Sequence, residues 1–156
     1  MKVTAIEEYG LRCMILLARN HEPLTLPEVS AREGLSLPYA AKLLMILKHS
    51  GMVNAARGRR GGYQLARPAE EIFLKEIFDA LGEPVFGANH CEKYSGESDS
   101  CIHTGDCVVK NVWGAFNDFV SNYMEKTTLA QLAAGGTPLQ ELSVSEKEID
   151  QQILEK

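Results

Sequence analysis

Three cysteine residues lie close together in the second half of this 156-residue chain. Nine residues separate Cys91 from Cys101, and five separate Cys101 from Cys107, in a segment rich in Gly, Ser and Asp. Thiolates on one loop can converge on one centre, because zinc and iron–sulfur clusters both favour thiolate sulfur as a ligand. We therefore predict a metal or redox centre in this loop, with a metal-free thiol switch as an alternative.

Three cysteines leave one position open on a four-ligand centre. His103, between two of the cysteines, is a candidate for that position, and His90 is a further one. Three Cys with one His or Glu also suit tetrahedral zinc, although the spacing lacks the Cys-x2-Cys knuckle of common zinc modules. The fourth cysteine, Cys13, lies among apolar residues and is interpreted as a buried apolar side chain.

The net charge of −5 is unevenly distributed along the chain. Residues 1–70 contain ten Lys/Arg against six Asp/Glu, a net +4, whereas residues 71–156 contain six against fifteen, a net −9. Binding to nucleic acid needs a local cationic face, because counterions are released only where cations meet phosphates. Only the first half of the chain can supply such a face.

The composition favours a globular protein without a membrane span. The hydrophobic fraction is 45%, and no stretch approaches the length of apolar residues that crosses a bilayer. The N-terminus has no signal-peptide pattern, so we expect a cytoplasmic protein whose thiols stay reduced. No Ser/His/Asp, phosphate-loop or paired-carboxylate motif is present, which argues against an enzyme.

Three helices are expected in the first 50 residues. A broad apolar stripe predicts a helix over residues 4–20, and Thr25 caps a second that ends at Gly34. Ser36 then begins a third helix, which continues to Ser50. Two short helices joined by a Gly-containing turn are typical of the helix-turn-helix motif.

A β-hairpin is expected directly after the third helix. Residues 52–57 and 63–65 read as two strands, joined by the glycine-rich turn of residues 58–62. Its tip carries Arg57, Arg59 and Arg60, which suit a narrow minor groove or phosphates. The hairpin therefore reads as the wing of a winged helix-turn-helix.

Two further helices are expected, the first over residues 72–81. The second is long and has a wide apolar face, which a small winged-helix domain cannot bury by itself. We therefore predict a homodimer interface, with packing on the chain's own first helix as the alternative. The expected interface residues are Val109, Val112, Trp113, Phe116, Phe119, Val120 and Tyr123.

The predicted fold is mainly α-helical, with a small β-hairpin wing and a long dimerisation helix. We expect a winged helix-turn-helix domain over residues 1–82 and a cysteine-bearing loop over residues 83–108. The dimerisation helix and a short following helix take residues 109–132, and residues 133–156 form an acidic tail.

Several of these segments resemble the winged-helix repressor family that includes the regulators IscR, NsrR and RirA. The resemblance covers about residues 1–132. The matching residues are Met1-Lys2-Val3-Thr4, Tyr9-Gly10-Leu11-Arg12, Leu35-Ser36-Leu37-Pro38-Tyr39, the wing from Arg57 to Pro68, the three loop cysteines and Thr127-Thr128-Leu129-Ala130.

The resemblance implies a dimer with swapped long helices and an iron–sulfur cluster on Cys91, Cys101 and Cys107, of 2Fe–2S or 4Fe–4S type. It also makes Glu8 of the partner subunit the first candidate for the fourth ligand, ahead of His103. Three departures weaken a direct transfer: the first cysteine gap is longer than in the best-known members, Lys110 stands where IscR-like members have a histidine, and Ala41 replaces a base-reading glutamate.

We therefore expect a dimeric transcriptional regulator, a repressor, that binds double-stranded DNA under the control of an iron–sulfur cluster sensing iron, redox state or nitric oxide. The third helix would enter the major groove and the wing arginines the adjacent minor groove or backbone. A zinc or thiol-based regulator with the same fold and an electron or cluster carrier are the alternatives. The expected DNA-binding residues are Ser36, Pro38, Tyr39, Ala40, Lys42, Arg57, Arg59 and Arg60.

Overall fold

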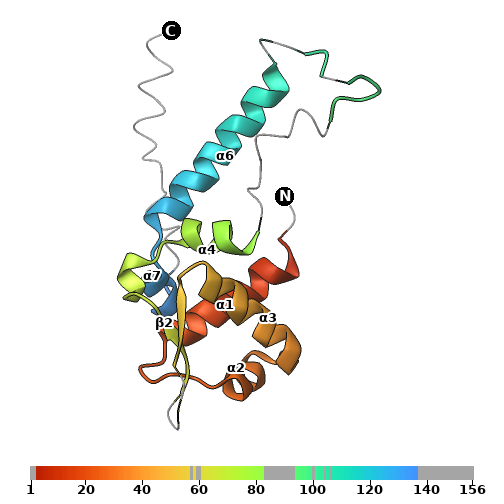
Figure 1. The fold of residues 1–156 in the computed structure, drawn as a ribbon. Helices are drawn as coiled ribbons and strands as arrows, with labels where there is room; N and C mark the ends of the chain where they lie inside the picture. The colour runs from red at the N-terminus through yellow and green to blue at the C-terminus, as the bar shows by residue number, and fades with distance from the viewer. Residues whose placement is uncertain are drawn as a thin grey trace, which may run out of the picture.

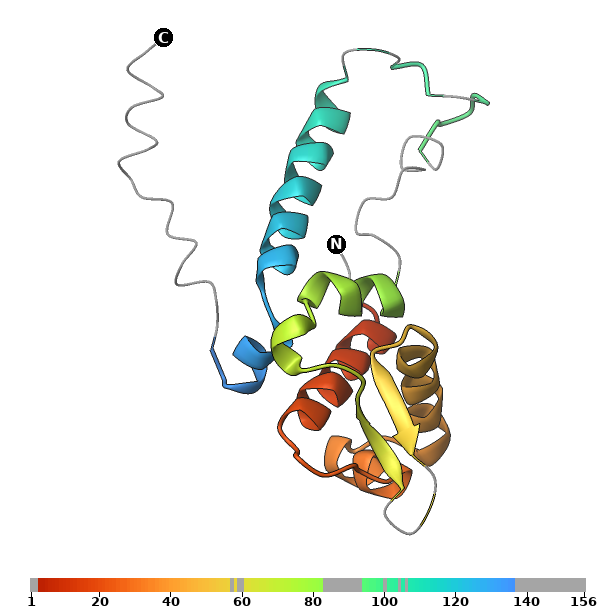
Figure 2. The same cartoon turned by 60° about the vertical axis from the view of Figure 1, so that its left-hand side comes forward.

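The structure is a computed structural model that describes residues 3–56, 58, 61–82, 94–99, 101–103, 105 and 107–136. The described chain is mainly helical with one two-stranded antiparallel hairpin, as predicted. A base formed by the first helices and the hairpin carries the long helix α6, which projects away from it (Figures 1 and 2). In chain order the elements are α1 (Ala5–Ala18), α2 (Leu26–Glu33), α3 (Leu37–His49), β1 (Val53–Ala56), β2 (Gly62–Leu65), the 3-10 turn η1 (Ala69–Glu71), α4 (Leu74–Leu81), α6 (Val108–Lys126) and α7 (Leu129–Ala133).

The helix-turn-helix pair α2–α3 has the boundaries that the sequence predicts. The Thr25 hydroxyl accepts a hydrogen bond from the Glu28 N–H at 3.4 Å, and the Glu28 carboxylate accepts one from the Thr25 N–H at 2.7 Å. This reciprocal pair satisfies N–H groups that a helix start leaves without partners. Gly34 ends α2 in the left-handed conformation, with φ of 66°.

Helix α1 lies at the centre of the hydrophobic core. It contacts α2, α3, α4, α7 and β2, and its inward face is almost fully shielded from water. Cys13 and Met14 are 0% exposed, which confirms the interpretation of Cys13 as a buried apolar side chain. The approach of α4 is so close that a Cβ on Gly10 would lie 2.5 Å from both methyl carbons of Leu81.

The hairpin pairs as expected, with Val53 opposite Leu65 and Ala56 opposite Gly62. Leu24 adds a short bridge to β2, since its N–H donates to the Tyr63 carbonyl at 3.0 Å and its carbonyl accepts from the Tyr63 N–H at 2.7 Å. A Cβ at Gly62 would lie 2.7 Å from the Leu24 carbonyl oxygen, so this close pairing requires glycine. The wing is therefore fastened to the segment between α1 and α2.

Helix α4 begins two residues later than the sequence indicates, because the preceding residues pair with the chain after α6. Ile72 is extended, and its carbonyl accepts a hydrogen bond from the Leu129 N–H at 2.8 Å. The Leu74 N–H donates to the Thr127 carbonyl, also at 2.8 Å. Phe73 and Thr128 thus form an antiparallel bridge that fastens the C-terminal end of α6 to the base.

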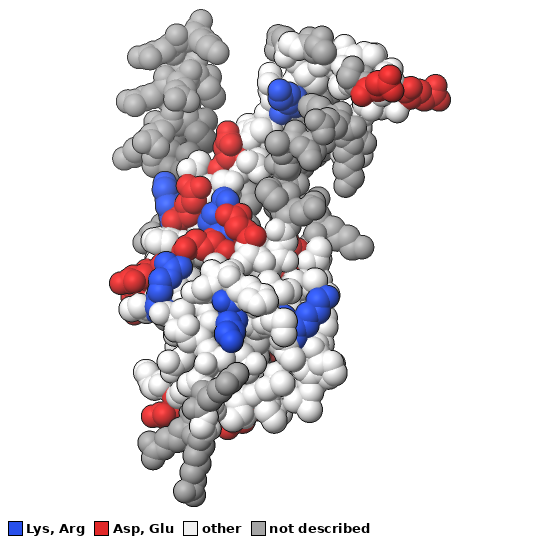
Figure 3. All heavy atoms as spheres, in the orientation of Figure 1, with Lys and Arg blue, Asp and Glu red and all other residues white. Residues whose placement is uncertain are grey.

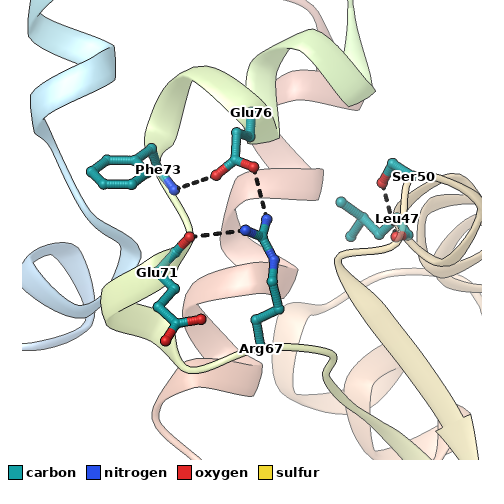
Figure 4. Close-up of polar contacts among 6 residues, drawn as sticks. All are labelled: Leu47, Ser50, Arg67, Glu71, Phe73 and Glu76. Carbon is teal, nitrogen blue, oxygen red and sulfur yellow. Dashed lines mark hydrogen bonds and ion pairs between the residues drawn. The ribbon is translucent and has the colours of Figure 1, made fainter.

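Arg67 connects the end of the wing to α4 (Figure 4). Its guanidinium donates to the Glu71 carbonyl at 3.1 Å and to the Glu76 carboxylate at 2.8 Å, and that carboxylate also accepts from the Phe73 N–H at 2.9 Å. Partial burial acts to raise the pKa of Glu76, but the Phe73 N–H and Arg67 outweigh it, so the pKa is lowered. These contacts connect the end of the wing to the first turn of α4.

Helix α6 packs against α4, and none of its 19 residues is buried. Its C-terminal half is partly covered, whereas residues 108–116 are all exposed. The sequence left packing on the chain's own first helix as the alternative to a dimer. Such packing does not account for the exposed apolar face of α6. A search of the described helices finds none with the length and apolar character of a membrane span.

Candidate nucleic-acid interface and thiol site

Helix α3 has one buried face and one open face. Its buried residues are Ala40, Leu43, Leu44 and Leu47. The open face begins at the N-cap Ser36, whose hydroxyl makes no capping hydrogen bond, unlike those of the N-cap residues of α1, α2 and α7. That hydroxyl is therefore available to a ligand. The exposed residues of the helix are Leu37, Pro38, Lys42, Met45, Lys48 and His49.

The structure corrects one predicted DNA contact and qualifies another. Ala40 is 0% exposed, so its sequence-based placement on the open face is wrong. Its position three, four and seven residues before Leu43, Leu44 and Leu47 marks it as a core residue. Tyr39 is half-buried, and its ring meets that of Tyr9 edge-on with centroids 5.9 Å apart.

The cations of the base divide into those with internal partners and those without. Arg12 pairs with Glu33 at 2.8 Å, Arg19 donates to the Ala133 carbonyl, and Arg32 donates to Asn20. Within the part of residues 1–70 that the structure describes, Lys42 and Lys48 make no ion pair or side-chain hydrogen bond. Both lie on the open face of α3, which is therefore the cationic face the charge distribution predicts.

The opposite charge gathers elsewhere on the molecule. Figure 3 shows acidic side chains around α4 and the adjoining part of α6, with basic side chains among them, whereas the surface over α3 is mostly uncharged with separate basic side chains. A polyanion is therefore repelled less on the α3 side than on the α4–α6 side. The predicted wing contacts Arg57, Arg59 and Arg60 lie outside the described residues.

Two of the three predicted ligand cysteines lie at the start of α6. Cys107 is the N-cap residue of the helix, Cys101 precedes it in the loop, and both are half-buried free thiols. His103 is exposed between them. Among the described residues no group of three His, Cys, Asp or Glu is placed to hold a metal ion. Cys91 and His90 lie outside those residues.

The adjacent carboxylates Glu7 and Glu8 have different surroundings. Glu7 is 9% exposed, accepts a hydrogen bond from the Thr4 N–H at 2.7 Å, and packs directly against Gly82. Glu8 is exposed, and its carboxylate makes no hydrogen bond or ion pair to any described residue. Glu7 is therefore a structural residue of the α1–α4 contact, whereas Glu8 is open to a ligand or to a second chain.

The predicted dimerisation residues form the exposed apolar face of α6. Val109 is 62% exposed, and Val112 and Phe119 are each 57% exposed. Trp113 and Phe116 are 39% exposed, while Val120 and Tyr123 are half-buried. These side chains recur every three or four residues, so they form a continuous stripe. Exposed apolar stripes of this kind are typical of surfaces that bind a protein partner.

Sequence and structure comparisons give the same assignment. The family model described as "Rrf2: Iron-dependent Transcriptional regulator" matches residues 3–135. The HTH-type transcriptional regulator IscR of Escherichia coli is 31% identical over 134 residues, which cover 85% of this chain and 80% of that protein.

Two solved structures have the same fold as this chain. CymR (YrzC), the global cysteine regulator of B. subtilis, is similar with a TM-score of 0.72 and 26% identity, covering 88% of this chain and 99% of CymR. T. potens IscR is similar with a TM-score of 0.69 and 27% identity, covering 90% and 91%. With its helix-turn-helix pair, wing and long helix, the chain belongs to the Rrf2 family of transcriptional regulators.

Proposed function

We propose that this regulator is a homodimeric repressor whose operator binding is controlled by an iron–sulfur cluster on Cys91, Cys101 and Cys107. The observation that carries the proposal is the position of Cys107 at the N-cap of α6. A ligand at that residue acts directly on the helix that we assign to the dimer interface. Any change in the centre then changes how the two DNA-binding domains are held relative to each other.

The chemistry of the described thiols suits such a cluster. Cys101 and Cys107 are unpaired and reachable from solvent, and both lie on a loop rather than in the core. A bound cluster would supply a group that iron supply, oxidants or nitric oxide can alter. Glu8 is the first candidate for the fourth ligand, donated by the partner subunit, because its carboxylate is exposed and free of partners among the described residues. His103 is the second candidate.

The proposed dimer is formed by the apolar face of α6. Exposed Val112 and Phe119 lie one above the other on this stripe, seven residues apart. Pairing with a second copy would remove these side chains from water, which is the main favourable term in association. Two copies of α3 would then face two half-sites of one operator.

The proposed DNA contacts are Ser36, Pro38, Tyr39 and Lys42 on α3, with Arg57, Arg59 and Arg60 from the wing. Ser36 and Lys42 can donate to phosphates or base edges, and the arginines suit the minor groove. Cations dominate this set, so affinity should fall steeply with salt.

The test is an anaerobic purification followed by binding to the gene's own upstream region. An iron–sulfur absorption spectrum with matching iron and sulfide content is expected, and fluorescence anisotropy should give different affinities for the loaded and cluster-free protein. Equal affinities would reject the control mechanism. A colourless protein loaded with zinc would overturn the cluster.

A metal-free thiol switch is the second candidate, favoured by the accessible free thiols Cys101 and Cys107 and by the structural similarity to CymR. It predicts that oxidant changes DNA affinity in protein without iron, with a disulfide or sulfenic acid detectable by mass spectrometry. Iron-free protein that is insensitive to peroxide would exclude it.

A further inference from the structure

The middle of the open face of α3 is apolar. Pro38, Ala41 and Met45 are spaced three and four residues apart, so they lie one above another over about two turns of the helix. Met45 is 57% exposed and Leu37, beside this line, is 48% exposed, while Ala41 is half-buried. The buried residues of α3 lie on the opposite side of the helix. The apolar line is therefore presented to whatever α3 meets.

The polar groups on this face are few. Residues 37–49 contain no Asn, Gln, Asp or Glu, the side chains that read adenine and cytosine edges directly, and Lys is the only guanine-reading residue type among them. Lys42, Lys48 and His49 flank the apolar line and can donate hydrogen bonds. A helix face with an apolar middle and basic residues at its edges is suited to bind a polyanion that exposes an apolar group in its groove.

The major groove of DNA offers one such group. Among the functions displayed there by the four base pairs, only the thymine C5-methyl is apolar. We propose that α3 selects its operator by packing Met45, with Pro38 and Ala41, on thymine methyl groups, while Lys42 donates to an adjacent guanine or phosphate. This inference rests on the proposed entry of α3 into the major groove and specifies what it recognises there.

A single exposed methionine on a helix needs no special explanation, because much of a protein surface is apolar. Here the apolar residues form a line over about two turns, and the unpaired lysines Lys42 and Lys48 lie beside it. Removal of these side chains should therefore cost little stability but should change which sequences are bound. Because stability and sequence preference are affected differently, the inference can be tested with protein that remains folded.

The experiment begins by selecting sites from a random DNA duplex pool with the full-length protein, isolated anaerobically and also freed of its metal. Thymines in the selected half-site are then replaced one at a time by uracil, which removes only the methyl group. We expect affinity, measured by anisotropy, to fall about fourfold for each contacted methyl, the effect of exposing one buried methyl-sized group. Uracil outside the half-sites should have no effect.

Met45→Ala provides the matched protein variant, since it should bind thymine and uracil with equal affinity at the position that Met45 contacts. Lys42→Ala is the control, because it should weaken binding to both and preserve the ratio. Specific binding by the native protein without any thymine–uracil difference would overturn the inference while leaving the proposed function intact. Failure to select any sequence, with or without metal, would overturn both.

Discussion

Helices α1 and α6 are both amphipathic in sequence, yet they occupy opposite environments. The apolar face of α1 is enclosed by α2, α3, α4, α7 and β2, and its residues Cys13 and Met14 are 0% exposed. Among the described elements α6 packs mainly against α4, and Phe119 on its apolar face remains 57% exposed. The periodicity of apolar residues therefore identifies the face of a helix that avoids water. Whether the same chain buries that face depends on how many other elements pack against it.

The largest difference that we expect between the two helices is in their cysteines. Burial raises the pKa of Cys13 in α1 to about 12. The negative charge of Glu33 adds to this rise, and the positive charge of Arg12 opposes it. The N-cap Cys107 of α6 is only half-buried. In cluster-free protein at pH 8, iodoacetamide should therefore modify Cys107 much faster than Cys13, whose own rate should be about a thousandfold lower than in unfolded protein, because only thiolate reacts.

Peptide mass spectrometry over time measures both rates in one sample. Urea-unfolded protein is the control, since unfolding should bring the two rates together. Similar rates in the folded protein would contradict the enclosure of α1.

A core substitution in α1 should have the next largest effect. Met14→Ala removes a side chain that is 0% exposed and should lower the free energy of unfolding by ~2–5 kcal/mol. Phe119→Ala in α6 is the matched comparison, and at concentrations where the chain is monomeric it should cost less than about 0.5 kcal/mol. Urea denaturation followed by circular dichroism gives both values. The distinction between the helices fails if the two substitutions cost the same.

Charge on the apolar face of α6 tests the proposed dimer. Val112→Asp with Phe119→Asp should weaken self-association by about 100-fold or more, since it places unpaired carboxylates in an apolar contact. Sedimentation velocity measures the dissociation constant, and circular dichroism should show an unchanged fold. Asn111→Asp adds a charge to the opposite side of the same helix and should leave the dimer intact. A dimer that survives the double substitution places the interface elsewhere.

The smallest expected effect on stability concerns the ion pair of Arg67 with Glu76, which joins the wing to α4. Helix α4 in turn contacts both α1 and α6. Each side chain is 39% exposed, so Glu76→Gln should cost only ~0–1 kcal/mol at pH 7. The folded pKa of Glu76 is lowered from its ordinary 4.5, so this stabilisation is present above that value and is lost as pH falls through the folded pKa.

The pH dependence of urea unfolding checks this prediction, with the native and Glu76→Gln curves converging in acid. Lys75→Met, which removes the surface pair with Asp79, is a control that leaves the Glu76 contacts in place. Curves that stay parallel down to low pH would contradict the role of the carboxylate.

The locally determined features of the fold could be read from the sequence. Thr25, Glu28 and Gly34 set the limits of α2 through contacts within a few residues, so their types suffice to predict it. The pairing of Ile72 with Leu129 could not be predicted, because it joins segments separated by the whole cysteine loop and α6. That pairing keeps Ile72 and Phe73 extended and delays the start of α4.

For the candidate DNA-binding face of α3, the sequence placed some residues correctly and one wrongly. Ser36, Pro38 and Lys42 lie on the open side of α3 as expected, whereas Ala40 lies in the core. The predicted contacts on α3 end at Lys42, whereas the open face continues to Met45 and Lys48. Met45 lies four residues after Ala41 and Lys48 lies seven residues after it, and this helical spacing was the available signal.

The bridge that fastens the C-terminal end of α6 to the base has a mechanical consequence. The helix is about 28 Å long, and the Phe73–Thr128 bridge holds its C-terminal end, whereas Cys107 is at the other end. It is therefore a lever arm with its fulcrum at the DNA-binding base. A sideways shift of about 5 Å at the thiol end corresponds to a rotation of only about 10° at the fulcrum. A modest force from the loop accordingly exerts a large torque on the base.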